Sequence, residues 1–125
     1  VLARSPAGAV EMLEMLGRDG TVRRLADGLP AIDDAALLFN ATSLGMAGQP
    51  DLDLDLSVLP RGCTVFDAVY TPLETGLLKA ARREGLPVVD GLSMLIGQAA
   101  GAFQLFYRQP APRQHDAELR ALLTR

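Results

Sequence analysis

The fold is decided by Cys63-Thr64-Val65-Phe66, a short apolar run, together with the helix-forming and apolar residues that follow it up to Asp90. A short apolar run of this kind is typical of a buried parallel strand. Thr71-Pro72-Leu73-Glu74 matches a capping box with proline at the first helical position, so it predicts a helix over residues 71–84. Pro87-Val88-Val89-Asp90 then predicts a second short strand. Two strands joined through a helix form a βαβ unit, in which the strands are parallel.

The segments on either side continue the same alternation of strands and helices. Ser5 supplies an N-cap and Pro6 the backbone angle of a first helical turn, and together they predict a helix over residues 6–17. Further strands are predicted at residues 21–25 and 36–39, and further helices at residues 92–107 and 116–123. The predicted fold class is therefore α/β, with a parallel sheet and flanking helices.

Composition and charge exclude several kinds of partner. The chain has 125 residues with 12 Lys+Arg against 15 Asp+Glu, so its net charge of −3 leaves no basic field for nucleic acid. No run approaches the roughly 20 apolar residues of a membrane span, so no membrane association is expected. One cysteine, Cys63, cannot form an internal disulfide, which favours a cytoplasmic location. Because Val1 is not an initiator methionine, we expect the chain to be part of a longer protein.

The alternating run Asp51-Leu52-Asp53-Leu54-Asp55-Leu56 resembles the start of a calcium loop. An EF-hand loop needs glycine at its sixth position and glutamate at its twelfth, where this chain has Leu56 and Gly62. We therefore expect a solvated loop that leads into a short helical turn, and no metal site.

Three polar blocks follow predicted strands, at the edge where parallel sheets bind ligands. They are Asn-Ala-Thr-Ser at residues 40–43, Asp-Ala-Val-Tyr-Thr-Pro at residues 67–72 and Asp-Gly-Leu-Ser-Met-Leu-Ile-Gly-Gln at residues 90–98. In this order they resemble the shikimate dehydrogenase family, which shows Asn-Ala-Thr-Ser, Asp-x-x-Tyr-x-Pro and Asp-Gly-x-x-Met-Leu-x-x-Gln. The resemblance spans nearly the whole chain but only about the C-terminal half of a family member.

The resemblance implies a Rossmann-like, NADP-binding domain at residues 1–90, incomplete because the family's first strand and glycine-rich turn do not occur in this sequence. Residues 91–125 would be C-terminal helices that pack on the substrate domain in the family. The implied reaction is the NADPH-dependent reduction of 3-dehydroshikimate to shikimate, in aromatic amino acid biosynthesis. The family's catalytic Lys and Asp are absent, so we expect no catalytic residue in this chain and no activity from it alone. The alternatives are a quinate/shikimate dehydrogenase and a non-catalytic nucleotide-binding module.

Two residues are implied to meet the adenosine 2′-phosphate of NADP. Ala3-Arg4-Ser5 stands where the family commonly has Asn-Arg-Thr, so Arg4 would be a charge-assisted donor to the phosphate, with Ser5 beside it. The alternative for Ser5 is helix capping alone, and for Arg4 a solvated surface position. Ala3 removes one donor, which leaves the strength of the preference for NADP over NAD open.

Further cofactor contacts are implied at five positions. Thr42 and Ser43 would bond the ribose or the phosphates, unless their hydroxyls only satisfy a local turn. Ala68 and Gly91 match positions where the backbone lines the nicotinamide, and close backbone approach requires glycine. Met94 matches a residue at the nicotinamide ring, with core packing as the alternative.

Tyr70 and Gln98 match residues that contact the carboxylate and hydroxyl groups of the substrate. On a helix Gln98 shares a face with Met94, Ala102 and Leu105, so its amide is expected to be buried among apolar groups and to need a partner. The alternatives are a glutamine bonded to a backbone carbonyl and a half-buried tyrosine with its hydroxyl at the surface.

The apolar helix over residues 92–107 is expected to lack a covering partner when the substrate domain is absent. An uncovered apolar helix exposes a large patch. We therefore expect the isolated 125-residue chain to self-associate or to dissolve poorly.

Overall fold

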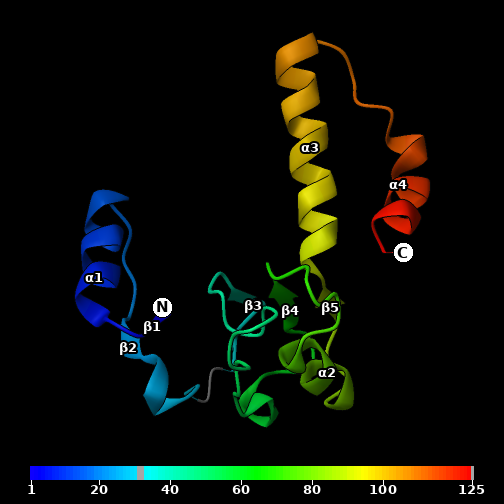
Figure 1. Cartoon of the computed structure of the whole chain (residues 1–125). Helices are drawn as coiled ribbons and strands as arrows, with labels where there is room; N and C mark the ends of the chain where they lie inside the picture. Colours follow the sequence, from blue (N-terminus) through cyan, green and yellow to red (C-terminus); the bar gives the residue numbers. More distant parts are fainter. Residues whose placement is uncertain (31–32, 125) are drawn as a thin grey trace.

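The computed structural model describes residues 1–30 and 33–124 (Figure 1). Its strands are β1 (Leu2–Ala3), β2 (Arg23–Arg24), β3 (Leu37–Asn40), β4 (Thr64–Asp67) and β5 (Val88–Val89). Its α-helices are α1 (Pro6–Met15), α2 (Gly76–Arg83), α3 (Gly91–Tyr107) and α4 (Asp116–Leu123), with short 3₁₀ turns at Leu25–Asp27, Leu56–Val58 and Arg113–His115. The predicted alternation of strands and helices is confirmed.

The strands form two parallel sheets that are not hydrogen-bonded to each other within the described residues. In the smaller sheet β1 pairs with β2, and Ala3 lies opposite Arg24. In the larger sheet the order is β3-β4-β5. Asn40 lies opposite Asp67 there, so β3 and β4 end level with each other. The predicted α/β class with parallel strands is confirmed.

The hydrophobic core lies between the larger sheet and α2. Val65 of β4 and Leu78 of α2 have no exposed surface, because the apolar face of α2 packs against β4. The loop before β4 adds Leu52, Leu56 and Leu59 to the same core. Cys63 is also fully buried there, so it packs as a small hydrophobic residue.

One helix start and one helix cap differ from prediction. The second helix begins at Gly76 rather than at residue 71, because Thr75 supplies the cap: its Oγ1 accepts the backbone N–H of Leu78 at 3.3 Å. The Thr75 hydroxyl also donates to the buried Asp67 at 2.6 Å, so a tertiary contact selects this start. Ser5 occupies the N-cap position of α1, but its side chain makes no capping hydrogen bond, so that part of the prediction is wrong.

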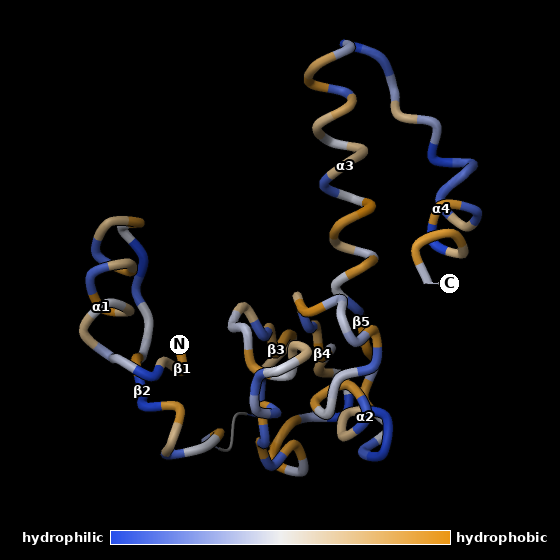
Figure 2. Tube along the Cα trace, in the orientation of Figure 1, coloured by the Kyte–Doolittle hydropathy of each residue, from blue (hydrophilic) through white to orange (hydrophobic). Residues whose placement is uncertain are grey.

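The long helix α3 extends away from the larger sheet, and the chain then turns back so that α4 lies beside it (Figure 1). Leu92 and Ile96 near its start are buried, whereas Leu105 and Phe106 near its end are 82% and 84% exposed. Figure 2 shows hydrophobic residues along the whole length of α3, including the part that stands clear of the sheet. The predicted apolar helix is confirmed, and its far half is uncovered in this chain.

Candidate functional site

The three polar blocks meet at one edge of the larger sheet. β3 ends at Asn40 and β4 at Asp67, and these residues are register partners. The third block begins at Asp90, directly after β5, whose Val89 lies opposite Phe66 of β4. Because parallel strands end at a common edge, blocks that are far apart in the sequence become neighbours there. This edge is the candidate functional site.

A buried hydrogen-bond network ties the ends of β3 and β4 to the start of α2. The fully buried Asp67 accepts at Oδ1 from Asn40 Nδ2 at 2.9 Å and from the backbone N–H of Val69 at 3.0 Å. Its Oδ2 accepts from Thr75 Oγ1 at 2.6 Å. Three donors offset the cost of removing a carboxylate from water. The network therefore holds two loops and one helix start in a single arrangement.

Asn40 extends this network into the first block. Its Oδ1 accepts from the backbone N–H and the hydroxyl of Thr42, at 3.0 and 2.8 Å. The Thr42 hydroxyl in turn accepts from the backbone N–H of Leu44 at 3.1 Å. Thr42 thus satisfies its own turn, as the alternative for that residue predicted. Ser43 is exposed, and its hydroxyl makes no hydrogen bond within the part of the chain that the structure describes, so it is the freer donor of the two.

Gly91 lies directly against the loop that follows β4. A Cβ atom built on Gly91 would lie 2.3 Å from the carbonyl oxygen of Ala68 and 2.6 Å from that of Val69. Both distances are far below van der Waals contact, so no other residue fits without moving the backbone. The structure therefore brings the predicted residues Ala68 and Gly91 together, and the close approach that requires glycine is made by the protein's own backbone.

Asp90 joins the start of α3 to α4. Its Oδ1 accepts from the backbone N–H of Ser93 at 2.9 Å and from the Ser93 hydroxyl at 3.1 Å, which caps α3. Arg120 of α4 donates through Nη1 to Oδ1 at 3.0 Å and through Nη2 to Oδ2 at 2.5 Å. The hydrogen bond from Arg120 is the main reason that the pKa of Asp90 lies below its usual value, and partial burial opposes this shift. Asp90 is therefore a charged cap at neutral pH.

The predicted substrate residues lie on the solvent side of the site. Tyr70 follows β4 and is 54% exposed. Gln98 of α3 is also exposed, so the prediction that its amide is buried is wrong. The reason is that α3 leaves the sheet, which uncovers the helix face that Gln98 shares with Leu105. Met94, one turn earlier, is partly buried.

Arg4 and Ser5 follow β1, and Arg4 lines a hollow that Leu44, the residue after the first block, also lines. Because Ala3 pairs with Arg24, the two arginines lie at the same edge of the smaller sheet. Both line an open hollow of about 400 Å³, together with Asp51 and Asp53. Neither arginine forms an ion pair within residues 1–30 and 33–124. Arg24 was not among the predicted site residues, although it lies one residue before the end of the strand predicted at residues 21–25.

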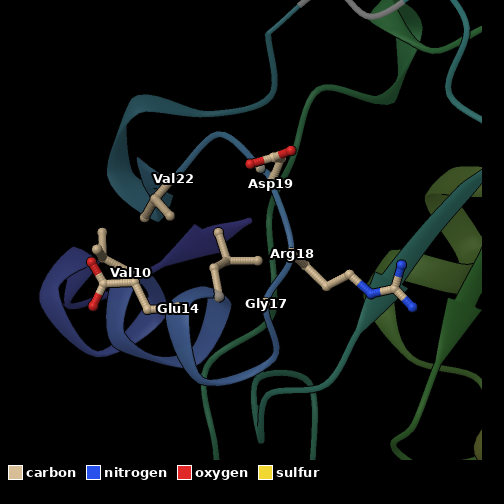
Figure 3. A pocket seen from close by; sticks show the side chains of 8 residues that line it. Val10, Glu14, Gly17, Arg18, Asp19 and Val22 are labelled. Carbon is tan, nitrogen blue, oxygen red and sulfur yellow. The ribbon is translucent and has the colours of Figure 1, made fainter.

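A second hollow of about 520 Å³ lies between α1 and the loop that leads to β2 (Figure 3). Val10 and Glu14 of α1 line it with Val22, and Figure 3 shows the Arg18 side chain extending away from these residues. It contains none of the predicted site residues, so it is not the candidate site.

The described residues contain no group of side chains suited to a metal ion, and no described helix has the length and apolar character to cross a membrane. In the acidic run Asp55 accepts from the backbone N–H of Ser57 at 3.0 Å and begins the 3₁₀ turn Leu56–Val58. This confirms the predicted loop with its short helical turn. The only histidine of the sequence, His115, is exposed, and its Nδ1 lies 3.2 Å from Glu118 Oε2.

No family model matches this chain, but individual proteins do. The NADP(+) shikimate dehydrogenase of Sphingopyxis alaskensis is 58% identical over 123 residues, which are 98% of this chain and 44% of the relative. A shikimate dehydrogenase of Rhodopseudomonas palustris is 47% identical over 121 residues. The alignments fall in the C-terminal portion of these relatives. The chain is a homologue of the C-terminal portion of shikimate dehydrogenases.

Solved structures of such enzymes share the fold. The Thermus thermophilus shikimate 5-dehydrogenase in complex with NADP(H) and shikimate has a TM-score of 0.72 and 31% identity, over 94% of this chain and 43% of its own. The Corynebacterium glutamicum quinate dehydrogenase in complex with NAD has a TM-score of 0.75 and 32% identity, over 94% and 44%. The predicted Rossmann-like class is confirmed, and the chain spans less than half the length of these relatives.

The residues that hold the site together were not among those predicted to form it. Asn40 and Asp67 each end an apolar strand, which was a signal for a buried polar residue that needs partners. Thr75 gave a weaker signal, since it lies just beyond a better sequence match to a capping box. Their mutual hydrogen bonds depend on the register of β3 against β4, which the sequence does not show.

Proposed function

We propose that this chain supplies the C-terminal portion of an NADP-dependent shikimate dehydrogenase, an oxidoreductase that reduces 3-dehydroshikimate to shikimate with NADPH. The observation that carries the proposal is the meeting of the three polar blocks at one sheet edge, in a chain 58% identical to a named shikimate dehydrogenase. The curated relatives do not favour the quinate alternative. If the protein were a non-catalytic nucleotide-binding module, the polar blocks that match the family's substrate-binding residues would have no substrate to bind.

The dinucleotide would lie along the carboxyl edges of the two sheets. Arg4 and Ser5 would meet the adenosine 2′-phosphate, and the open edge that Arg4 shares with Arg24 suits a phosphate because both guanidinium groups are free of ion pairs within the described residues. On the larger sheet Thr42 and Ser43 would contact the ribose or phosphates. Ala68, Gly91 and Met94 would lie at the nicotinamide end.

The substrate would be oriented rather than chemically activated by this chain. Tyr70 in the loop after β4 and Gln98 of α3 are both exposed, so both side chains are available to a ligand's hydroxyl or carboxylate group. NADPH supplies the hydride when it is bound. No residue of this chain is assigned to proton transfer, so its contribution is to geometry and binding.

We propose that the chain consists of a partial nucleotide-binding domain at residues 1–90 and C-terminal helices at residues 91–125, as the family resemblance implies. The open edges of β1 and β3 support it, because one further parallel strand between them would join the two sheets. The glycine-rich turn and the catalytic Lys and Asp would then come from a segment outside this chain.

A chimaeric enzyme tests the proposal. The N-terminal portion of the Sphingopyxis alaskensis relative, which this chain does not cover, is fused ahead of Val1. We expect shikimate-dependent reduction of NADP by the chimaera and none by the 125-residue chain alone. A folded chimaera that binds NADP without turnover would support the non-catalytic alternative. Turnover with quinate in place of shikimate would support the quinate alternative.

We further propose that the isolated chain self-associates through α3. Leu105 and Phe106 are more than four-fifths exposed, and an exposed apolar face of this kind favours association between copies of the chain. Leu105→Lys should lower the weight-average mass in sedimentation at high concentration. Met15→Lys, at an equally exposed position on α1, is the matched control and should leave it unchanged. A monomer in the unsubstituted chain would contradict the proposal.

We infer a cytoplasmic location for the protein. The free, fully buried thiol of Cys63 supports a reducing compartment, because it packs as a core side chain and has no second cysteine in the sequence. Fractionation of cells that produce the protein tests this directly.

A further inference from the structure

Arg120 makes every side-chain hydrogen bond that joins the C-terminal segment, residues 108–124, to the rest of the described chain. The other polar contacts of the C-terminal segment stay inside it: Arg113 donates to Asp116 at 2.6 Å, and His115 lies 3.2 Å from Glu118. Arg120 instead reaches back to Asp90, thirty residues earlier in the sequence. The position of α4 beside α3 therefore depends on this one ion pair more than on any other polar contact.

The partner of Arg120 is the carboxylate that begins α3. Both guanidinium nitrogens donate to Asp90, at 3.0 and 2.5 Å, in the forked geometry that favours a fixed orientation. Arg120 Nη1 also lies 3.3 Å from the Ser93 hydroxyl. The Asp90 side chain is 17% exposed and that of Arg120 is 36% exposed, so solvent screens this pair less than a fully exposed one. The ion pair therefore fixes the first turn of α3 to a residue of another helix, α4.

The first turn of α3 is packed too closely on the loop after β4 to change its angle without disturbing that contact. Gly91, next to Asp90, is packed so closely on Ala68 and Val69 that a Cβ atom would collide with both carbonyl oxygens. A small tilt of α3 at this point would change that contact and would displace Met94 and Gln98 further along the helix. Both of these residues belong to the proposed ligand edge.

We propose that Arg120 is a positioning residue for the dehydrogenase reaction, which acts through Asp90 to set the angle at which α3 presents Met94 and Gln98 to the bound ligands. This inference rests on the proposed function. Arg120 would act without touching either ligand. Its effect on the reaction comes from geometry, because reacting groups held slightly out of place react much more slowly.

The test compares three variants of the active chimaera. Arg120→Gln removes the charge and the fork, and we expect kcat/KM for shikimate to fall about tenfold, with kcat reduced in the folded enzyme. Arg120→Lys keeps the charge but loses the second hydrogen bond, so it should recover part of that loss. Arg113→Gln is the matched control, since its ion pair stays within the C-terminal segment, and it should leave both constants unchanged.

Two results separate a failure of this inference from a failure of the proposed function. An inactive chimaera with the unsubstituted chain would count against the proposed function. An active chimaera in which Arg120→Gln changes stability but leaves kcat and KM unchanged would overturn the positioning role.

A second readout on the chimaera does not depend on turnover. In an NMR titration of the Asp90 carboxyl group, Arg120→Gln should raise its pKa toward the ordinary value of about 3.9, and no change would show that the ion pair does not form. If Arg120→Gln fails to fold, the chimaera with Asp90→Asn tests the same ion pair through kcat and KM, because the amide removes the partner charge while keeping an oxygen that can cap α3.

Discussion

The larger sheet with α2 and the smaller sheet with α1 are both parallel strands flanked by a helix, yet they are buried to very different degrees. In the first, Val65, Asp67 and Leu78 have no exposed surface. In the second, β2 is exposed along its length and Ala9 is the buried residue of α1. Two strands of two residues each cannot enclose a core, whereas three strands covered by α2 and a leucine-rich loop can. Stability in this chain is therefore concentrated around β4, next to the candidate site.

The largest effect should come from a cavity in the buried region. Leu78→Ala removes a fully buried side chain, and we expect it to lower the free energy of unfolding by about 3 kcal/mol. Met15→Ala on α1 removes a side chain that is 82% exposed and should change it by less than about 0.5 kcal/mol. Urea denaturation followed by circular dichroism measures both. Equal decreases in the free energy of unfolding for the two variants would show that burial does not make the larger sheet more stable than the smaller one.

The buried network should be the next most sensitive part. Asp67→Asn preserves size but places an amide N–H₂ or a neutral oxygen where the carboxylate now accepts from Thr75, Asn40 and Val69. Lost charge-assisted hydrogen bonds predict a destabilisation of about 2 kcal/mol. Asp53→Asn, in the exposed acidic run, is the control and should leave the denaturation midpoint in place. An unchanged denaturation midpoint for Asp67→Asn would show that this hydrogen-bond network does not stabilise the fold.

The Asp90–Arg120 pair tests how far the stable region extends toward the C-terminus. The pKa of Asp90 is lowered in the folded chain, so its contribution is present above the unfolded value of about 3.9 and is lost as the pH falls through the folded value. At pH 7 we expect Arg120→Gln to be less stable by about 1 kcal/mol. Thermal melts across the acid range should show this difference closing below about pH 4. A difference that persists undiminished at low pH would assign it to packing instead.

The smallest effect should come from the surface of α2. Arg82 Nε lies 3.0 Å from Glu74 Oε1, with both side chains about half exposed. Exposed ion pairs contribute little, so Glu74→Gln should cost at most about 0.5 kcal/mol, and added salt should reduce even that. Denaturation at low and high ionic strength measures the change. A loss comparable to that of Asp67→Asn would show that charge, rather than burial, sets the difference between regions.

Much of the fold was predictable because strong local signals agree with it. The apolar runs that became β3, β4 and β5 and the apolar helix that became α3 lie close to where they were expected. The start of α2 was predicted wrongly, because the local capping pattern at Thr71 was overridden by the buried hydrogen bond between Thr75 and Asp67. The burial of Gln98 was also predicted wrongly, since helical periodicity shows which residues share a face but not whether another element covers it.

By itself the sequence determined the kinds and order of the elements, the parallel class of the sheet and the three polar blocks at strand ends. These follow from short-range patterns: apolar runs, proline and glycine positions, and polar residues directly after strands. Only the tertiary structure decided that Asp67 would bind Asn40 and Thr75, that Gly91 would press on Ala68, and that Arg120 would hold Asp90. Each of these contacts joins residues from different elements, so it depends on strand register and helix packing, which no local pattern encodes.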